Sequence, residues 1–352
     1  MGAPLLSIII PLTSTVPKEL ERNLSTIARN LTPAVEVLGL SWGCPKSSEA
    51  AFREAFGGYA RARLLAVPRE TTCGAVFNLG IRECQGVYFT YTDADNEMTP
   101  TTVERILHVI QDKPTMDLLI MTAVMGHMYD DMYFVPEAPL RSFAGIHEGT
   151  GLRLLETLGH ETGFLRCELF LGCYRRAFIL EQNLWADESF QDRVAHIWVP
   201  QVYFKARLCS TMQRLLPSYW CVRRPIDWGL NHREQAIKSL LNAVLFLGRF
   251  YRDHRKEMPH AARRTWAVTT FTGFLSKIFS PKFEHLRLTV RERQKIIKTL
   301  WDDPEVGGTL RQMEVYLYFR QRVFCKLLRA YSRCCLVAPL LHFWEEFVHY
   351  VH

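Results

Sequence analysis

The chain has 352 residues, of which 48% are hydrophobic and 22% are charged, and its formal net charge is +7. This composition is typical of a globular protein with one large or two modest domains, and it excludes a disordered or fibrous chain. No apolar run approaches the roughly 18 residues of a membrane-spanning helix. No basic residue precedes the apolar start, so no signal peptide is predicted either.

The N-terminal part of the chain alternates between strand and helix patterns. Pro11 is expected to end the first strand, and the helix that follows has apolar residues at helical spacing, from Leu20 to Leu31. Alternation at such short range favours βαβ units and a mostly parallel sheet flanked by helices. Strands are predicted at 5–12, 34–42, 62–68, 87–95 and 116–126, and helices at 18–31, 47–60, 74–84 and 99–113.

The fourth predicted strand ends in Asp93-Ala94-Asp95. In open parallel sheets, ligands bind at the carboxyl ends of the strands. Two carboxylates at such an end can hold Mg²⁺ or Mn²⁺, which are hard cations that prefer oxygen ligands. A pair of this kind is also common in ordinary surface loops. A divalent cation, Mn²⁺ or Mg²⁺, is nevertheless the predicted cofactor.

The ten cysteines are scattered along the chain, and none forms a C-x-x-C pair. Without a secretory signal, this pattern predicts reduced and mostly buried thiols. Clustered Cys and His at ligand spacing are missing from the sequence, so no zinc site is expected.

The C-terminal third differs in composition from the rest. Residues 229–352 carry 21 Lys and Arg against 11 Asp and Glu, and their patterns are almost purely helical. We therefore expect two domains, 1–228 and 229–352. The basic helices fit a cap with a solvated face, or attachment to an anionic membrane surface, where each Lys or Arg contributes about 1 kcal/mol. Trp266 and Phe271 suit either a core or an interfacial helix. Nucleic acid is not an expected partner, because the region is hydrophobic and carries no recognised motif.

Four segments follow one another in an informative order: SIIIPLTSTVPKELERNLSTI, FNLGIRECQGVYFTYTDAD, GCYRRAFILEQNLWADESFQDRVAHIWVPQVYFKA and LPSYWCVRRP. Together they resemble the family 2 glycosyltransferases with the GT-A fold. The resemblance covers roughly residues 1–228. It implies an α/β domain with a GT-A-like, mostly parallel sheet, followed here by an all-helical C-terminal region.

The resemblance also implies a reaction. A sugar would pass from a nucleoside-diphosphate sugar to a glycan or lipid-linked acceptor hydroxyl, with inversion, in the synthesis of a surface polysaccharide. The protein would be cytoplasmic, with a peripheral contact of its C-terminal helices on the inner face of the membrane. Asp192 would be the general base, Asp95 the direct metal ligand, and Asp93 a neighbour of the ribose or of a metal-bound water.

Further contacts implied by the resemblance are of two kinds. Diphosphate or acceptor contacts are implied for Arg223, Arg224 and Glu188. Donor contacts are implied near the strand ends, at Pro11, Thr13, Ser41, Trp42, Asn78 and Asp93.

The residues by themselves leave other interpretations open. Asp192 is also typical of an acidic residue at a helix start. Asn78 is equally typical of a helix-packing residue, and Arg223 and Arg224 of solvent-facing side chains. The run Tyr174-Arg175-Arg176 favours a solvated basic turn.

Two positions depart from the family pattern. Ser41 and Trp42 stand where the family carries an Asp that accepts a hydrogen bond from the nucleotide base, and Gln191 replaces a Glu beside Asp192. Two alternatives therefore remain. One is a catalytically degenerate protein that binds a nucleotide sugar or glycan, and the other is a non-enzymatic membrane-docking assembly protein. A nucleotidyltransferase would need a Gly-rich loop after the first strand, which PLTSTVPKE does not supply.

Overall fold

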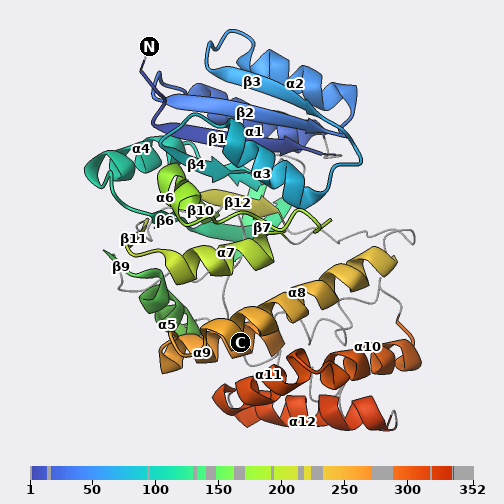
Figure 1. Ribbon diagram of the computed structural model, residues 1–352. Helices are drawn as coiled ribbons and strands as arrows, with labels where there is room; N and C mark the ends of the chain where they lie inside the picture. The colour runs from blue at the N-terminus through green and yellow to red at the C-terminus, as the bar shows by residue number, and fades with distance from the viewer. Residues whose placement is uncertain are drawn as a thin grey trace. The chain divides into compact units, whose positions relative to one another are not determined.

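The computed structural model describes most of the chain, and its residues form two compact units (Figure 1). The first unit consists of Met1–Gly151 with Cys167–Pro225, and the second of Leu152–Arg166 with Ile226–His352. The assignment of 1–228 and 229–352 as domains stays a prediction. The described residues are 2–13, 17–92, 96–129, 133–139, 148–161, 171–191, 194–212, 218–222, 233–271, 288–317, 319–334 and 336.

An eight-stranded sheet lies at the centre of the first unit. Its strands are β1 (Leu6–Leu12), β2 (Val35–Trp42), β3 (Ala62–Val67), β4 (Tyr88–Tyr91), β6 (Leu118–Ile120), β9 (Glu148–Gly149), β10 (Gly172–Arg175) and β11 (Cys209–Thr211). They are ordered β3-β2-β1-β4-β10-β6-β11-β9. β10 is antiparallel to both of its neighbours and β9 to β11, while the other adjacent pairs are parallel.

Helices cover both faces of this sheet. They are α1 (Pro17–Arg29), α2 (Lys46–Phe56), α3 (Cys73–Glu83), α4 (Thr102–Asp112), α6 (Arg176–Glu181) and α7 (Val194–Lys205). α1 packs against α2, and α3 packs against α7. Right-handed crossovers place the first pair and α3 on opposite faces, because the chain reverses direction across the sheet after β3.

Apart from the strand at 116–126, the predicted strands and helices of the N-terminal region are confirmed to within a few residues. Their apolar residues form the core, and β4 is buried throughout. The prediction that Pro11 ends the first strand is wrong, because β1 continues to Leu12. β1 pairs with β4 only as far as Ile9, so Pro11 lies where the strand has a single neighbour and its missing N–H is tolerated.

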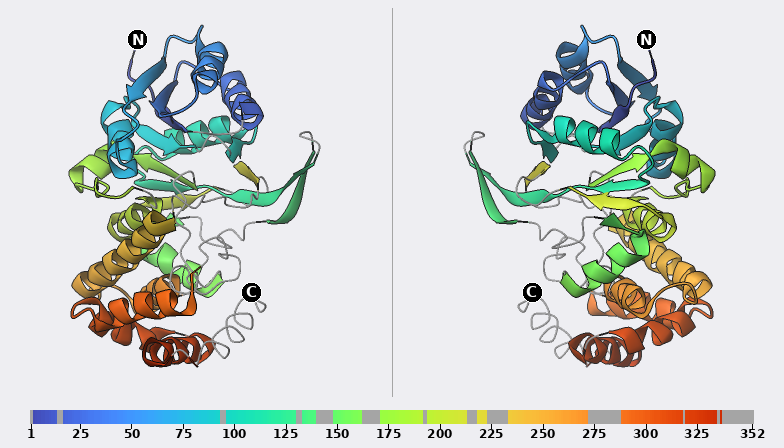
Figure 2. Two further views of the ribbon diagram at one scale, coloured as in Figure 1. Left: turned by 90° about the vertical axis from the view of Figure 1, so that its right-hand side faces the viewer. Right: turned by 90° about the vertical axis from the view of Figure 1, so that its left-hand side faces the viewer.

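A smaller sheet in the same unit contains β5 (Asn96–Met98), β12 (Tyr219–Val222), β7 (Ala123–Tyr129) and β8 (Tyr133–Pro139), in that order. β7 and β8 run together as an antiparallel hairpin (Figure 2). The single strand predicted at 116–126 is wrong. The chain leaves β6 after Ile120 and enters the second sheet at Ala123, so one apolar run supplies strands to two sheets.

The second unit is helical. It contains α5 (Gly151–Glu161, apart from its first residue), α8 (Arg233–His254), α9 (His260–Val268), α10 (Val290–Asp302), α11 (Val306–Met313), the short 3₁₀ helix η6 (Glu314–Tyr316) and α12 (Phe319–Arg333). Trp266 and Phe271 are buried, so their interpretation as core residues is confirmed. Within the described residues, no helix is both long and apolar enough to cross a bilayer. Seven cysteines are free thiols in the described part of the chain, namely Cys44, Cys73, Cys84, Cys173, Cys209, Cys325 and Cys334.

Candidate active site

The carboxyl ends of β1, β2 and β4 meet at one edge of the large sheet. Leu12 pairs with Ser41 across β1 and β2, so Thr13 and Trp42 are the next residues along this edge. On the other side, the backbone N–H of Thr92 donates to the carbonyl of Ile9. Asp93 and Asp95 follow Thr92 directly but lie outside the described residues. Of the implied donor contacts, Pro11, Thr13, Ser41 and Trp42 thus share the edge at which the Asp pair begins.

Helix α1 anchors the chain on both sides of the Asp pair. The side chain of Asn23 donates to the Thr92 hydroxyl (3.4 Å) and accepts from the backbone N–H of Met98 (3.2 Å). The carboxylate of Glu97, which is 9% exposed as a side chain, pairs with the Arg22 guanidinium. Buried contacts of this kind fix where the segment 93–95 begins and ends.

Asp93 and Asp95 carry carboxylates, which are the oxygen ligands that hard divalent cations prefer, and the described residues on both sides of them are held by α1. Elsewhere in the described part of the chain, no group of three or more His, Cys, Asp or Glu side chains is arranged to hold a metal ion.

Ser41 has a carboxylate beside it that the sequence interpretation did not include. Its buried hydroxyl donates to Oε1 of Glu49 at 2.5 Å. Glu49 lies in the first turn of α2, and its side chain remains 34% exposed. The sequence signal that could have identified Glu49 is an acidic residue soon after the second strand. The edge therefore carries a carboxylate next to the position where the family pattern has an Asp.

Asn78 connects α3 to the loop at 184–190. Its amide nitrogen donates to the Ala186 carbonyl (2.9 Å) and to Glu188 Oε1 (3.0 Å), while its amide oxygen accepts from the Ala186 N–H (2.9 Å). Both amide hydrogens are used within the protein, and the residue is 1% exposed. This is the geometry of a helix-to-loop clamp, and a direct donor contact of Asn78 stays a prediction.

Other residues at the start of α3 hold the same loop. The Thr72 hydroxyl donates to the Glu188 carbonyl (2.5 Å), and the Gly74 N–H donates to the Phe190 carbonyl (3.0 Å). A Cβ at Gly74 would lie 2.2 Å from the Asp187 carbonyl oxygen, so only glycine fits. The sequence interpretation missed Thr72 and Gly74. The loop leads to Asp192, which lies outside the described residues, as do Arg223 and Arg224.

Glu188 is held in its ionised form. Arg82 donates to its Oε1 at 2.8 Å, and the same guanidinium lies 5.2 Å from the ring centroid of Trp185. The hydrogen bond from Asn78, followed by that from Arg82, lowers the pKa of the Glu188 carboxyl below its usual value. Glu188 is thus part of the clamp, and its implied diphosphate or acceptor contact stays a prediction.

At neutral pH the wild-type protein is expected to be more stable than Glu188→Gln by no more than about 1 kcal/mol, because Glu188 and Arg82 are half exposed. Folding lowers the pKa of Glu188, so this contribution is present above its ordinary value of 4.5 and is lost as the pH falls through the folded-state pKa. Urea unfolding at pH 7 and at lower pH measures the difference. Arg82→Gln should also be less stable than the wild type at pH 7 and lose this disadvantage in acid. If the stability difference between the wild type and Glu188→Gln is the same at low pH, the ionised Glu188 does not contribute as proposed.

The interpretation of Tyr174-Arg175-Arg176 as a solvated turn is wrong. Tyr174 is 1% exposed in β10, and Arg175 pairs with the buried carboxylate of Asp117 at 2.7 Å. Arg176 donates to the carbonyl of Ile81 at the end of α3 (3.1 Å). Arg175 thus ties β10 to the residue just before β6, and Arg176 ties the start of α6 to the end of α3.

Comparison with known protein families gives one match. Residues 7–136 match the model of the family described as glycosyl transferase family 2. These residues form a family 2 glycosyltransferase domain. The predicted family is confirmed for these residues and the predicted GT-A fold for the chain, and the family match supports a nucleotide-sugar glycosyltransferase.

Solved structures resemble the glycosyltransferase over nearly its whole length. Residues 1–349 of S. aureus TarS match with a TM-score of 0.66 at 13% identity, covering 99% of this chain and 92% of that one. The crystal structure of TarS 1–349 in complex with UDP-GlcNAc gives 0.67, and that with UDP gives 0.63, at the same identity and coverage. No curated protein matches the sequence. At this identity the likeness establishes the fold.

Proposed function

We propose that this glycosyltransferase moves a sugar from a nucleoside diphosphate to a hydroxyl of a glycan or lipid-linked acceptor, with inversion, in the synthesis of a surface polysaccharide. The observation that carries the proposal is that described residues next to two acid-bearing segments are hydrogen-bonded to α1 and α3. α1 holds the residues that flank Asp93 and Asp95, and α3 holds the loop that leads to Asp192. The TarS complexes with UDP-GlcNAc and UDP support a nucleotide sugar as donor.

On the donor side, Asp93 and Asp95 would hold Mn²⁺ or Mg²⁺. When bound, such a cation neutralises charge on the leaving diphosphate. We assign Glu49 as the carboxylate that faces the nucleotide base, since Ser41 orients it and a third of its side chain is exposed. This carboxylate restores the charged acceptor that Ser41 and Trp42 do not supply, which argues against a degenerate protein.

On the acceptor side, Asp192 would take the proton from the attacking hydroxyl. The hydroxyl oxygen forms its bond to the anomeric carbon as the bond to the diphosphate breaks, and one displacement of this kind inverts the anomeric centre. The clamp formed by Thr72, Gly74 and Asn78 would fix the chain that precedes Asp192, because a general base has to lie within hydrogen-bond reach of the proton it removes.

We further propose that the basic helices of the second unit contact an anionic membrane surface on its cytoplasmic side. Because Trp266 and Phe271 belong to the core, the contact would rely on Lys and Arg side chains, each contributing about 1 kcal/mol. Flotation with anionic vesicles should therefore weaken steeply as salt is raised. Binding that is insensitive to salt would exclude this electrostatic contact.

The decisive experiment is a thermal-shift series with UDP, GDP, CDP and dTDP sugars, each with and without Mn²⁺. One nucleotide is expected to raise the melting temperature only with the metal, since a ligand at 100 times its dissociation constant stabilises by about 2.7 kcal/mol. Asp95→Ala should abolish this shift, and Glu49→Gln should reduce it.

Glu54→Gln is the matched control, because Glu54 is an exposed carboxylate on the same helix as Glu49. An undiminished, metal-dependent shift in Asp95→Ala would exclude the metal assignment. No shift with any nucleotide sugar would favour the membrane-docking alternative.

A further inference from the structure

The helices α10 and α12 carry a large excess of positive charge. Together they hold nine Lys and Arg side chains against two carboxylates, those of Glu292 and Asp302. The sequence of α12 contains no acidic residue. The excess of seven charges equals the formal net charge of the whole chain, which is +7. Because α10 and α12 pack against each other, this charge is concentrated in one part of the second unit (Figure 1).

Five of these cations are exposed and have no hydrogen-bond or ion-pair partner in the described part of the chain. They are Arg291, Lys295 and Lys298 on α10, and Lys326 and Arg333 on α12. Their spacing of three, four or seven residues places them along one face of each helix, and we call the surface that carries them the basic surface. The opposite faces are buried and apolar, for example at Ile297 and Leu328. Like charges four residues apart destabilise a helix, so the arrangement favours an anionic partner.

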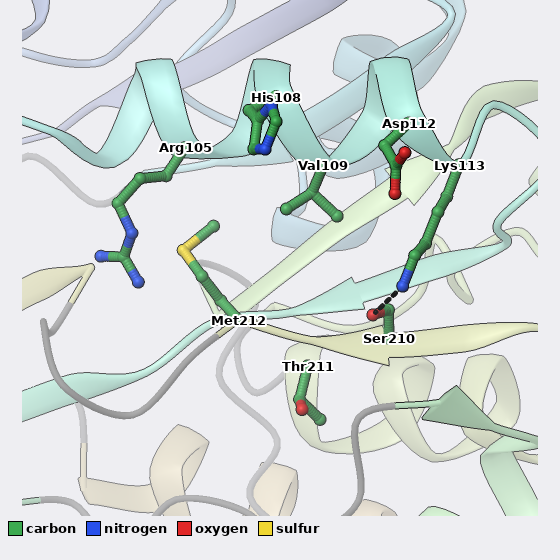
Figure 3. A pocket seen from close by; sticks show the side chains of 8 residues that line it. All are labelled: Arg105, His108, Val109, Asp112, Lys113, Ser210, Thr211 and Met212. Atoms are coloured by element: carbon green, nitrogen blue, oxygen red, sulfur yellow. Dashed lines mark hydrogen bonds between the residues drawn. The ribbon is translucent and has the colours of Figure 1, made fainter.

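Several cations elsewhere in the chain are neutralised by carboxylates. On α8, Arg249 and Arg252 both pair with Glu305. In the cavity between α4 and β11 of the first unit, which Figure 3 shows, Lys113 pairs with Glu148. The basic surface differs from these places because its charges are close together and lack such partners within the described residues.

Two exposed apolar side chains lie at one end of the basic surface. The hydroxyl of Tyr331 donates to the carbonyl of Val290 at 2.6 Å, so the last turn of α12 lies beside the first turn of α10. The side chain of Val290 is 46% exposed, and that of Leu336, three residues after the end of α12, is 83% exposed. Apolar side chains next to Lys and Arg are typical of surfaces that lie in a membrane interface.

We propose that the basic surface is the part of the second unit that binds anionic lipid headgroups. Its five cations would contact the headgroups, and Val290 and Leu336 would enter the apolar boundary beneath them. This assignment rests on the membrane contact proposed above and gives that contact to one surface. A soluble acidic polymer would also match the cations, but it would leave the two apolar side chains in water.

The test is flotation of the full chain with phosphatidylcholine vesicles, with and without phosphatidylglycerol. Lys295→Gln combined with Lys326→Gln is expected to weaken binding to the anionic vesicles roughly 10- to 50-fold, since each cation contributes about 5-fold. Lys238→Gln combined with Lys256→Gln is the matched control, because both lysines are exposed in the second unit and lie outside α10 and α12. The control should bind almost as tightly as the wild type. Equal losses in the two double variants would overturn the assignment and leave a membrane contact without a preferred surface.

A further double variant decides between a lipid surface and an acidic polymer. Val290→Ser combined with Leu336→Ser should weaken vesicle binding roughly 3- to 10-fold and leave binding to dextran sulfate unchanged. Unchanged vesicle binding would contradict the lipid assignment and favour the polymer. An unchanged melting temperature shows that each variant is folded. If the wild type does not float with anionic vesicles, the basic surface and the membrane contact both fail, whereas sugar transfer is tested separately by the metal-dependent thermal shift.

Discussion

Asp192→Asn is expected to lower kcat roughly 10²- to 10⁴-fold, because an amide cannot take the proton from the acceptor hydroxyl. Nucleotide-sugar binding should persist, since the proposed role of this side chain is on the acceptor. Sugar transfer and the metal-dependent thermal shift, measured on the same preparation, separate the two effects.

Asp187→Asn is the matched control. Asp187 lies in the same loop and accepts from the Ser189 N–H (2.9 Å), yet has no assigned part in the chemistry. Its transfer rate should stay close to that of the wild type. Equal losses in both variants would mean that the loop responds to any lost charge, and the base assignment would then fail.

Glu36→Ala is expected to lower the free energy of unfolding by about 3–5 kcal/mol, the range found when one partner of a buried ion pair is removed. The Glu36 carboxylate is 2% exposed and accepts from the Ser7 hydroxyl (2.5 Å), the Gln85 N–H (2.7 Å) and Arg63 (2.8 Å). It thereby joins β1, β2, β3 and the connection between α3 and β4. Urea unfolding at pH 7 measures the loss.

The control for Glu36 is another partner of the same arginine. Glu83 lies 3.7 Å from Arg63 and is 43% exposed, so Glu83→Ala should change stability by less than about 1 kcal/mol. A similar small change in Glu36→Ala would mean that water or another side chain satisfies the orphaned donors.

The order of strands and helices in the N-terminal region was predictable because each segment carries its own signal. β1 and β2 are short segments rich in Leu, Ile and Val, and α1 repeats apolar residues at helical spacing. Pro11 misled the prediction, because a proline is a strand breaker only where both sides of the strand are paired. That condition depends on where β4 ends, which the sequence of β1 does not contain.

The site was predictable only in part, for a similar reason. The position of the Asp pair follows from the end of one strand. The partners of Asn78 lie 108 and 110 residues away, and no local pattern signals contacts at such separation. Glu49 was missed because its importance depends on a hydrogen bond to Ser41 across the turn from β2 into α2.

The place of α5 has a consequence for synthesis on the ribosome. This helix belongs to the second unit although the first unit continues after it, and Leu154 and Leu155 are fully buried there. The carbonyl of Leu155 accepts from the hydroxyl of Thr265, which is 110 residues later. At 5–20 residues per second, α5 emerges roughly 5–20 s before this partner. During that interval its apolar face is a target for chaperones. The nascent chain should therefore depend on chaperones most between the synthesis of α5 and that of α9.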